Sequence, residues 1–184
     1  MDLMTTNTHL MTAEDLIALP RGQHRYELVK GELLTMSPAG EEHGSITGRL
    51  TVLLGSYILQ NKLGLIYCAE TGFKLESDPD TVLAPDISFI SRERVGTLSE
   101  SYRYGPPDLV VEVKSPGDSD YKIESKCKRW LSFGVKAVWL IDPKKRTVRI
   151  LLPSGERTVL TEVNEIVDDS VVTGFRLNVS EIFD

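Results

Sequence analysis

The feature that most constrains this chain is an apolar run that carries two charges. Residues 109–113, LVVEV, are aliphatic except for Glu112, a composition typical of a strand buried on both faces of a sheet, and Lys114 follows directly. Burying either charge alone would cost several kcal/mol, so each must pair, meet a metal ion or open onto a cleft. Residues two apart on a strand share a face at about 6.6 Å. Both side chains can therefore converge on one small object, such as a divalent cation with its water.

A second carboxylate would be needed to hold a hard cation such as Mg²⁺, which prefers oxygen ligands. Three Pro-Asp steps offer one, at Asp80, Asp86 and Asp108. Asp80 falls in a polar turn, and Asp108 lies about 13 Å along the strand from Glu112, so we expect Asp108 to cap a proline turn. Asp86 precedes ISFI, a strand that can pair with the central one and place its carboxylate opposite Glu112. Asp86 could instead merely begin its strand as a cap.

The composition indicates a single soluble domain. A chain of 184 residues with 41% apolar and 26% charged residues can bury a core, and we expect a tail over 1–11 and one domain over 12–184. No apolar run approaches the about 20 residues of a membrane span, and the start lacks a basic segment followed by an apolar one. We therefore expect a cytoplasmic protein. The isolated cysteines, Cys68 and Cys127, fit reduced thiols, and the scattered histidines argue against a histidine-based zinc site.

Charge is distributed unevenly along the chain. The net charge of −6 argues against a nonspecific nucleic-acid coat, yet residues 122–149 hold nine Lys and Arg against two acidic residues. On a helix expected over 119–133, Lys122, Lys126 and Arg129 fall on one arc beside an apolar arc. We expect these three side chains to contact a phosphate polymer on one side of the molecule. The alternative is that they are solvated residues of a surface helix.

Periodicity and turn residues predict alternating strands and helices with hairpins at both ends of the chain. The polar segment 91–106 is expected to form a mobile loop, and 180–183 a terminal turn. The expected helices cover residues 12–20, 42–61 and 119–133. The expected strands cover residues 25–30, 32–36, 65–69, 71–76, 82–90, 109–113, 137–141, 147–152, 158–161 and 171–177.

Several stretches resemble a known group of nucleases. The Pro85-Asp86 strand, the Glu112-x-Lys114 strand and the basic helix resemble the PD-(D/E)XK nuclease superfamily. More closely, ordered blocks over residues 12–143 resemble the Uma family of restriction endonucleases: TAEDLIALP, RYELVKGELLTMSP, His43 opening a long helix, APDISFISRER, PDLVVEVKSP, and Lys126 with Gly134-Val135 before AVWLIDP.

The resemblance implies an α/β (α+β) fold with a restriction-endonuclease-like core. Its mixed central β-sheet is flanked by helices, carries extra N- and C-terminal hairpin strands, and has a metal site at its edge. The implied activity is metal-dependent hydrolysis of DNA phosphodiester bonds. Asp86 and Glu112 would hold Mg²⁺ or Mn²⁺ with help from the Val113 carbonyl, and Lys114 would orient or deprotonate a water. Many relatives have lost this strand lysine and use one on the following helix, where this chain has Lys126.

Further residues are candidate outer members of the site. Glu27, Glu70 and His43 could each be accessory or structural, and Lys126 could contact the scissile phosphate or only solvate its helix. Trp130 stands where relatives often have tyrosine, which we interpret as a packing change. Because duplex cleavage needs two cuts and this domain offers one site, we expect a two-fold homodimer. Two other functions remain open, a nucleic-acid-binding or protein-interaction module without turnover and a small-nucleotide phosphohydrolase.

Overall fold

The computed structural model describes residues 10–20, 24–69 and 71–184. Its helices are α1 (Ala13–Ala18), α2 (Glu41–Gln60), α3 (Asp120–Ser132) and α4 (Ser180–Phe183), with a short 3₁₀ turn at Arg92–Arg94. Its strands are β1 (Arg25–Val29), β2 (Glu32–Met36), β3 (Gly64–Cys68), β4 (Phe73–Glu76), β5 (Thr81–Leu83), β6 (Ile87–Ser91), β7 (Arg103–Tyr104), β8 (Leu109–Val113), β9 (Ala137–Asp142), β10 (Thr147–Leu151), β11 (Arg157–Thr161), β12 (Glu165–Asp168) and β13 (Phe175–Asn178).

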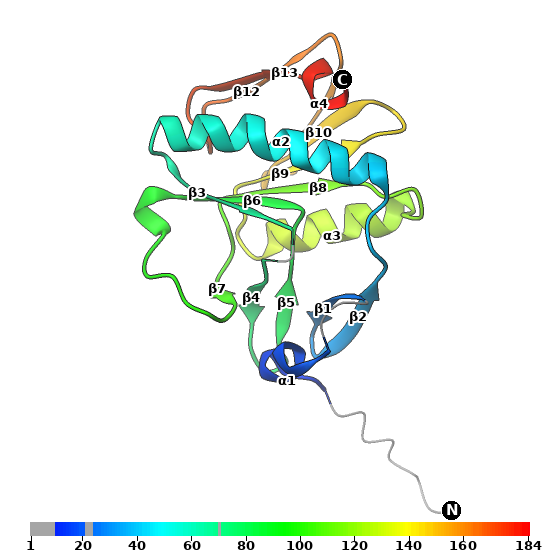
Figure 1. Cartoon of the computed structure of the whole chain (residues 1–184), viewed down its shortest axis with the longest axis vertical. Helices are drawn as coiled ribbons and strands as arrows, with labels where there is room; N and C mark the ends of the chain where they lie inside the picture. Colours follow the sequence, from blue (N-terminus) through cyan, green and yellow to red (C-terminus); the bar gives the residue numbers. More distant parts are fainter. Residues whose placement is uncertain (1–9, 21–23, 70) are drawn as a thin grey trace, which may run out of the picture.

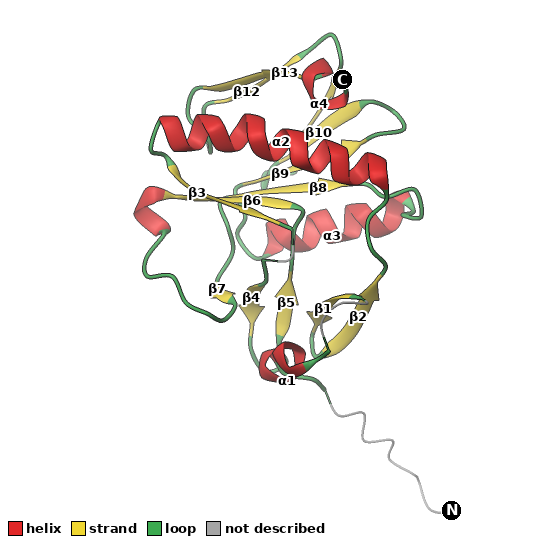
Figure 2. Cartoon of the chain, viewed as in Figure 1, coloured by secondary structure: helices red, strands yellow, loops and turns green. Residues whose placement is uncertain are grey.

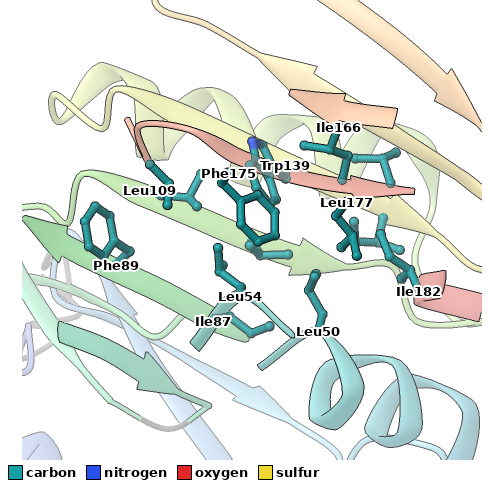
Figure 3. Packing of buried hydrophobic residues seen from close by; sticks show 14 of the residues in the cluster. Leu50, Leu54, Ile87, Phe89, Leu109, Trp139, Ile166, Phe175, Leu177 and Ile182 are labelled. Carbon is teal, nitrogen blue, oxygen red and sulfur yellow. The ribbon is translucent and has the colours of Figure 1, made fainter. Parts of the chain in front are cut away.

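The central sheet has the strand order β11-β10-β9-β8-β6-β3, and it lies between two helices (Figure 1). β8 and β9 run parallel, whereas the other neighbours are antiparallel, so the sheet is mixed. α2 packs on one face, where Leu50 and Leu54 point toward Ile87 and the stacked rings of Trp139 and Phe175 (Figure 3). α3 packs on the other face. The sequence prediction of a mixed sheet flanked by helices is confirmed.

The central strand β8 is buried along its whole length, as its aliphatic composition predicts. Because side chains alternate across a strand, Val111 and Val113 belong to the core under α2, while Val110 belongs to the core under α3. Glu112 therefore shares the α3 face with Val110. This alternation places a carboxylate inside the layer between the sheet and α3.

A second sheet, with the order β2-β1-β5-β4-β7, lies beside the first and carries α1 (Figure 2). The predicted β1–β2 hairpin is present, and its turn residues Lys30 and Gly31 have φ of 52° and 77°, as a tight two-residue turn requires. α1 begins with the expected cap, in which the Thr12 side chain accepts from the Asp15 amide and the Asp15 carboxylate accepts from the Thr12 amide.

The predicted strand over 82–90 is two strands in the structure. β5 belongs to the second sheet and β6 to the central sheet, so the chain crosses between them at residues 84–86. Pro85 has no backbone N–H to donate and cannot continue a ladder, which explains the break. The crossing places Asp86 at the junction of the two sheets.

The C-terminal region packs over α2 and the central sheet. The strand predicted over 171–177 is shorter and shifted toward the C-terminus, because Gly174, with φ of 79°, turns the chain just before β13 begins. Val172, before this turn, is buried in the core but is not part of a strand. β13 pairs with β12 as a hairpin, and the terminal turn is the short helix α4. Across the described ranges, no helix combines the length and apolarity needed to cross a bilayer.

Candidate active site

Three carboxylates and one amine converge where the two sheets meet. Glu27 comes from β1, Asp86 from the crossing before β6, and Glu112 from β8, and they are only 3%, 5% and 3% exposed. Lys126 of α3 places its Nζ 3.1 Å from Glu27 Oε1 and 3.0 Å from Glu112 Oε1. The ladder pairs Ile87 with Val111, so the next position brings Asp86 beside Glu112 on neighbouring strands.

The Asp86 carboxylate is contacted at both of its oxygens by groups from other elements, and the backbone amide of Val113 donates to it. Its Oδ2 accepts from the Val113 amide at 2.8 Å and lies 3.1 Å from His43 Nε2, while Oδ1 is 3.8 Å from the Arg25 guanidinium. Burial raises the pKa of Asp86, but the hydrogen bond and charge of His43 and the Val113 amide outweigh it and leave that pKa lowered. The same hydrogen bond raises the pKa of His43. Asp86 is therefore an ionised carboxylate.

The Glu112 carboxylate is held from the α3 side. Its Oε1 accepts from Trp130 Nε1 at 2.7 Å, and its Oε2 accepts from Lys126 Nζ at 3.1 Å. Burial raises the pKa of Glu112 to about 7, with Lys126 opposing and the negative charges of Asp86 and Glu27 adding to the rise. The carboxyl thus sits in a strongly acidic neighbourhood that favours a second cation beside Lys126.

Lys126 is held as a cation. Burial lowers its pKa, but the nearby charges of Glu112, Glu27 and Asp86 outweigh burial and raise it. Its Nζ also donates to the Ala84 carbonyl at 3.4 Å. An amine that keeps its proton can donate hydrogen bonds and offset negative charge, but it cannot accept a proton from water.

Lys114 is placed differently from the sequence expectation. Its Nζ is 2.6 Å from Asp120 Oδ1 and 3.7 Å from Asp142 Oδ2, at the N-terminus of α3 and the end of β9. The hydrogen bond to Asp120 raises the pKa of Lys114, so it too keeps its proton. Sharing a strand face with Glu112 does not decide where the Lys114 amine lies, because its long side chain instead reaches Asp120 and Asp142. The structure gives the place beside Glu112 to Lys126.

Two of the other acidic residues considered in the sequence, Asp108 and Asp80, have structural roles. Asp108 is buried just before β8, where it is 2.8 Å from both Arg94 and Lys136 and accepts from the Ser91 amide at 2.8 Å, so it lies apart from the carboxylate cluster and has a structural role. Asp80 accepts from the Ala13 amide and from Lys74, each at 2.7 Å, and so ties α1 to the second sheet. Glu70 lies outside the described residues.

The predicted basic stripe on α3 does not form one surface. The Lys122 side chain is 76% exposed, whereas that of Lys126 turns inward and is 19% exposed. Arg129 lines a shallow cleft of about 480 Å³ together with Lys128 and Lys30. Basic groups on and beside α3 that a polyanion could reach are therefore Lys122 and the three residues at this cleft.

Two site residues were missed in the sequence. Trp130 was interpreted as packing, yet it lies one helical turn after Lys126, a spacing that lets both side chains reach Glu112. Arg25 contacts Asp86 and lies two residues before Glu27 on β1, so alternation turns both toward the carboxylates. The i, i+4 spacing and the strand alternation were the available signals.

The donor chemistry of this cluster fits a hard divalent cation. Asp86 and Glu112 offer carboxylate oxygens, and proteins commonly hold Mg²⁺ through one or two carboxylates with several waters retained. Hydrogen bonds occupy Asp86 Oδ2, whereas Oδ1 lies 3.8 Å from the Arg25 guanidinium, beyond hydrogen-bond distance. As the side chains lie, no three His, Cys, Asp or Glu residues of the described ranges form a metal-holding group. The Lys126 amine stands between Glu27 and Glu112.

Comparison with known proteins places the chain among nuclease-like folds. The family model Uma2, described as "Putative restriction endonuclease", matches residues 13–180. The structure also resembles a crystal structure described as "a putative nuclease belonging to DUF820 from Anabaena variabilis", with a TM-score of 0.79, 22% identity, and coverage of 94% of this chain and 97% of that chain. At that identity the likeness concerns the fold alone, and it confirms the predicted fold class. A comparison with curated proteins finds no match.

Proposed function

Because the chain belongs to the Uma2 family, we propose that it is a metal-dependent endonuclease that hydrolyses phosphodiester bonds of DNA. The observation that carries this proposal is the convergence of Asp86, Glu112 and Lys126 from three separate elements on one buried point. Buried charges are costly, so a fold that gathers three carboxylates around one lysine supports a chemical role for this cluster rather than a stabilising one.

The proposed metal ligands are Asp86, Glu112 and the Val113 carbonyl, and the metal is Mg²⁺ or Mn²⁺. When bound, such an ion supplies Lewis acidity and a more acidic water for phosphodiester hydrolysis. His43 and the Val113 amide keep Asp86 ionised and fix its orientation, and Trp130 fixes the orientation of Glu112. These contacts hold the carboxylates ready before substrate arrives.

Lys126 takes the role that the sequence pattern assigned to Lys114. Its amine keeps its proton, so it would donate a hydrogen bond to the scissile phosphate or to the attacking water and offset the charge that builds on phosphate. Lys114 belongs to the ion pairs with Asp120 and Asp142 that hold the start of α3 against the end of the sheet. Glu27 completes the cluster by sharing Lys126 with Glu112.

We further infer a homodimer that works in the cytoplasm. A duplex presents two strands to one small site, so a two-fold dimer would deliver both cuts. Cys68 and Cys127 are unpaired, which supports a reducing compartment.

Cleavage of supercoiled plasmid tests the proposal. The wild-type protein should nick and linearise plasmid with Mg²⁺ or Mn²⁺ and leave it intact with a chelator. Glu112→Gln should abolish cleavage but retain DNA binding, because a neutral amide is a poor ligand for Mg²⁺. Glu165→Gln, which alters a surface acid paired with Arg176, is the control and should cut normally.

The alternatives give different results in the same assay. Tight DNA binding with no metal-dependent cleavage would favour a binding module that keeps the fold. Hydrolysis of mononucleotides with no action on polymers would favour a small-nucleotide phosphohydrolase. Cleavage by Glu112→Gln with unchanged metal dependence would show that the site lies elsewhere.

A further inference from the structure

A cleft of about 580 Å³ lies beside the acidic cluster and has no part in the mechanism above. It lies on the second sheet, between α1, the start of β1 and the segment that follows β2. Its volume falls within the range of about 300–1,000 Å³ that is usual for small-ligand sites in proteins. The cleft is thus large enough for one planar ring system with its attached sugar.

Three aromatic side chains, His24, Tyr26 and Tyr102, stand in a lining that is otherwise mostly aliphatic. His24 and Tyr26 lie with ring centroids 6.1 Å apart at an interplanar angle of 44°. Across the cleft, Tyr102 lies against the backbone at Gly72, where an added Cβ would come within 2.4 Å of the ring. Glycine at position 72 therefore allows the Tyr102 ring to pack directly against the backbone just before β4. Such aromatic rings are suited to stacking.

The cleft adjoins the candidate active site and shares wall residues with it. Arg25 lines the cleft, and its guanidinium is 3.8 Å from Asp86 Oδ1. Ala84 also lines it, and its amide donates to Glu27 while its carbonyl accepts from Lys126. A molecule in the cleft would therefore stand beside the proposed reaction point.

The charge of the lining limits the occupant further. Among the described lining residues, Arg25 is a fixed cation and none is a carboxylate. The matching ligand is a flat, weakly polar ring that carries an anion at the end facing Arg25. A nucleobase attached to its phosphodiester has this form, and bases stack on aromatic side chains whatever their sequence.

We propose that this cleft receives one unstacked nucleobase of the strand whose phosphodiester lies at Asp86, Glu112 and Lys126. The inference rests on the proposed function and adds its substrate class. Taking a base out of a duplex costs unpairing and unstacking, a cost that is smallest for single strands and damaged or mismatched sites. The enzyme therefore prefers strands with unpaired bases over perfect duplex.

Binding measured with a chelator present tests the inference without turnover. Ala39 is exposed and lines the cleft, so Ala39→Trp fills it. Ala18 is exposed on α1 near the cleft but is not part of its lining, so Ala18→Trp is the matched control. The ligands are a fluorescent single-stranded oligonucleotide and a fully abasic strand of equal length, each followed by fluorescence anisotropy.

The wild-type protein and Ala18→Trp should bind the base-bearing strand about 5- to 100-fold more tightly than the abasic strand, the span expected for loss of one stacked base. Ala39→Trp should bind both strands with the weaker affinity. Tyr26→Ala, which removes a stacking ring rather than filling the space, should show the same loss.

Three results would overturn the inference. They are equal binding of the two strands by the wild-type protein, an unchanged preference in both Ala39→Trp and Tyr26→Ala, and no binding of single strands at all. Failure of the proposed function would look different. A protein that shows the base preference here but never cleaves plasmid would retain the cleft as a base site and lose only the catalytic proposal.

Discussion

Replacing Lys126 by methionine should lower the free energy of unfolding, because it removes the cation that pairs with two buried carboxylates. Methionine keeps the length and apolar stem of the side chain but removes the amine that lies 3.1 Å from Glu27 and 3.0 Å from Glu112. Both carboxylates are nearly inaccessible to water and would lose their ion-pair partner. We therefore expect the variant to be less stable and inactive.

The size of the effect follows from burial. Removing one partner of a buried ion pair typically costs about 3–5 kcal/mol, because the remaining charge stays desolvated. For a domain of this size, each kcal/mol shifts Tm by about 2–4 °C, so Tm should fall by about 6–20 °C. Lys122→Met removes an amine from the same helix, but one that is largely exposed and 3.9 Å from Asp118, and should change stability by less than about 0.5 kcal/mol.

Thermal and urea unfolding of a double-mutant cycle provide the assay. Adding Glu112→Gln to Lys126→Met neutralises one stranded carboxylate, so the double variant should recover about 1–2 kcal/mol relative to Lys126→Met alone. A loss below about 1 kcal/mol for Lys126→Met, or strict additivity of the two changes, would refute the reasoning. Either result would mean that the buried amine and carboxylate do not interact as the structure indicates.

Three further outcomes are expected. Asp108→Asn should cost about 2 kcal/mol of unfolding free energy at neutral pH by weakening charged hydrogen bonds. Burial raises the pKa of Asp108, but Lys136, the Ser91 amide and Arg94 outweigh burial and lower it, so the carboxylate stabilises the fold above its ordinary pKa of 3.8 and loses this effect as pH falls below it. The unfolding free energy of the variant should therefore depend less on pH in acid. Lys128→Ala combined with Arg129→Ala should weaken DNA binding and reduce the slope of log affinity against log salt concentration by about one to two units. An unchanged slope would mean that the cleft lined by Lys30, Lys128 and Arg129 is only a solvated surface. Light scattering at micromolar concentration should show a dimer, and a monomer with full duplex activity would contradict that prediction.

Local chemistry made most elements predictable from the sequence. The Thr12 cap, the Lys30-Gly31 turn and the aliphatic run of β8 each depend on neighbouring residues, and each appears where expected. Among the exceptions is the segment 82–90, where periodicity predicts one strand. A proline inside that pattern was the signal for a break, but the sequence does not say that the two halves join different sheets.

The site was only partly readable because distant partners decide where long side chains end. The strand pattern indicated Asp86 and Glu112, since backbone register fixes both. Lysine position depends instead on which acids lie within reach, and Asp120 takes Lys114 while Glu112 takes Lys126. Ion pairs with acids outside residues 122–149 also reduce the excess positive charge that this segment presents.

That excess offers a clear example of the same limit. Lys136 lies 2.8 Å from Asp108, an acid outside the counted range, so the count includes this cation but not the acid that neutralises it. Arg149 lies 2.6 Å from Glu124, 25 residues before it in the chain, so the count includes both but does not show that they pair. A count along the chain cannot distinguish a cation that faces solvent from one that closes an internal ion pair. Only the three-dimensional arrangement assigns Arg129 to an open cleft.

The central claim is that Asp86 and Glu112 together hold a divalent cation. A crystal of the protein soaked in Mn²⁺, with data collected to detect anomalous scattering, tests it most directly. The account predicts an anomalous peak bonded at about 2.2 Å to oxygens of both carboxylates, slightly longer than Mg²⁺ bonds, with Lys126 still beside Glu112. No peak between the two carboxylates in crystals of active protein, or a peak bound to other residues, would contradict it.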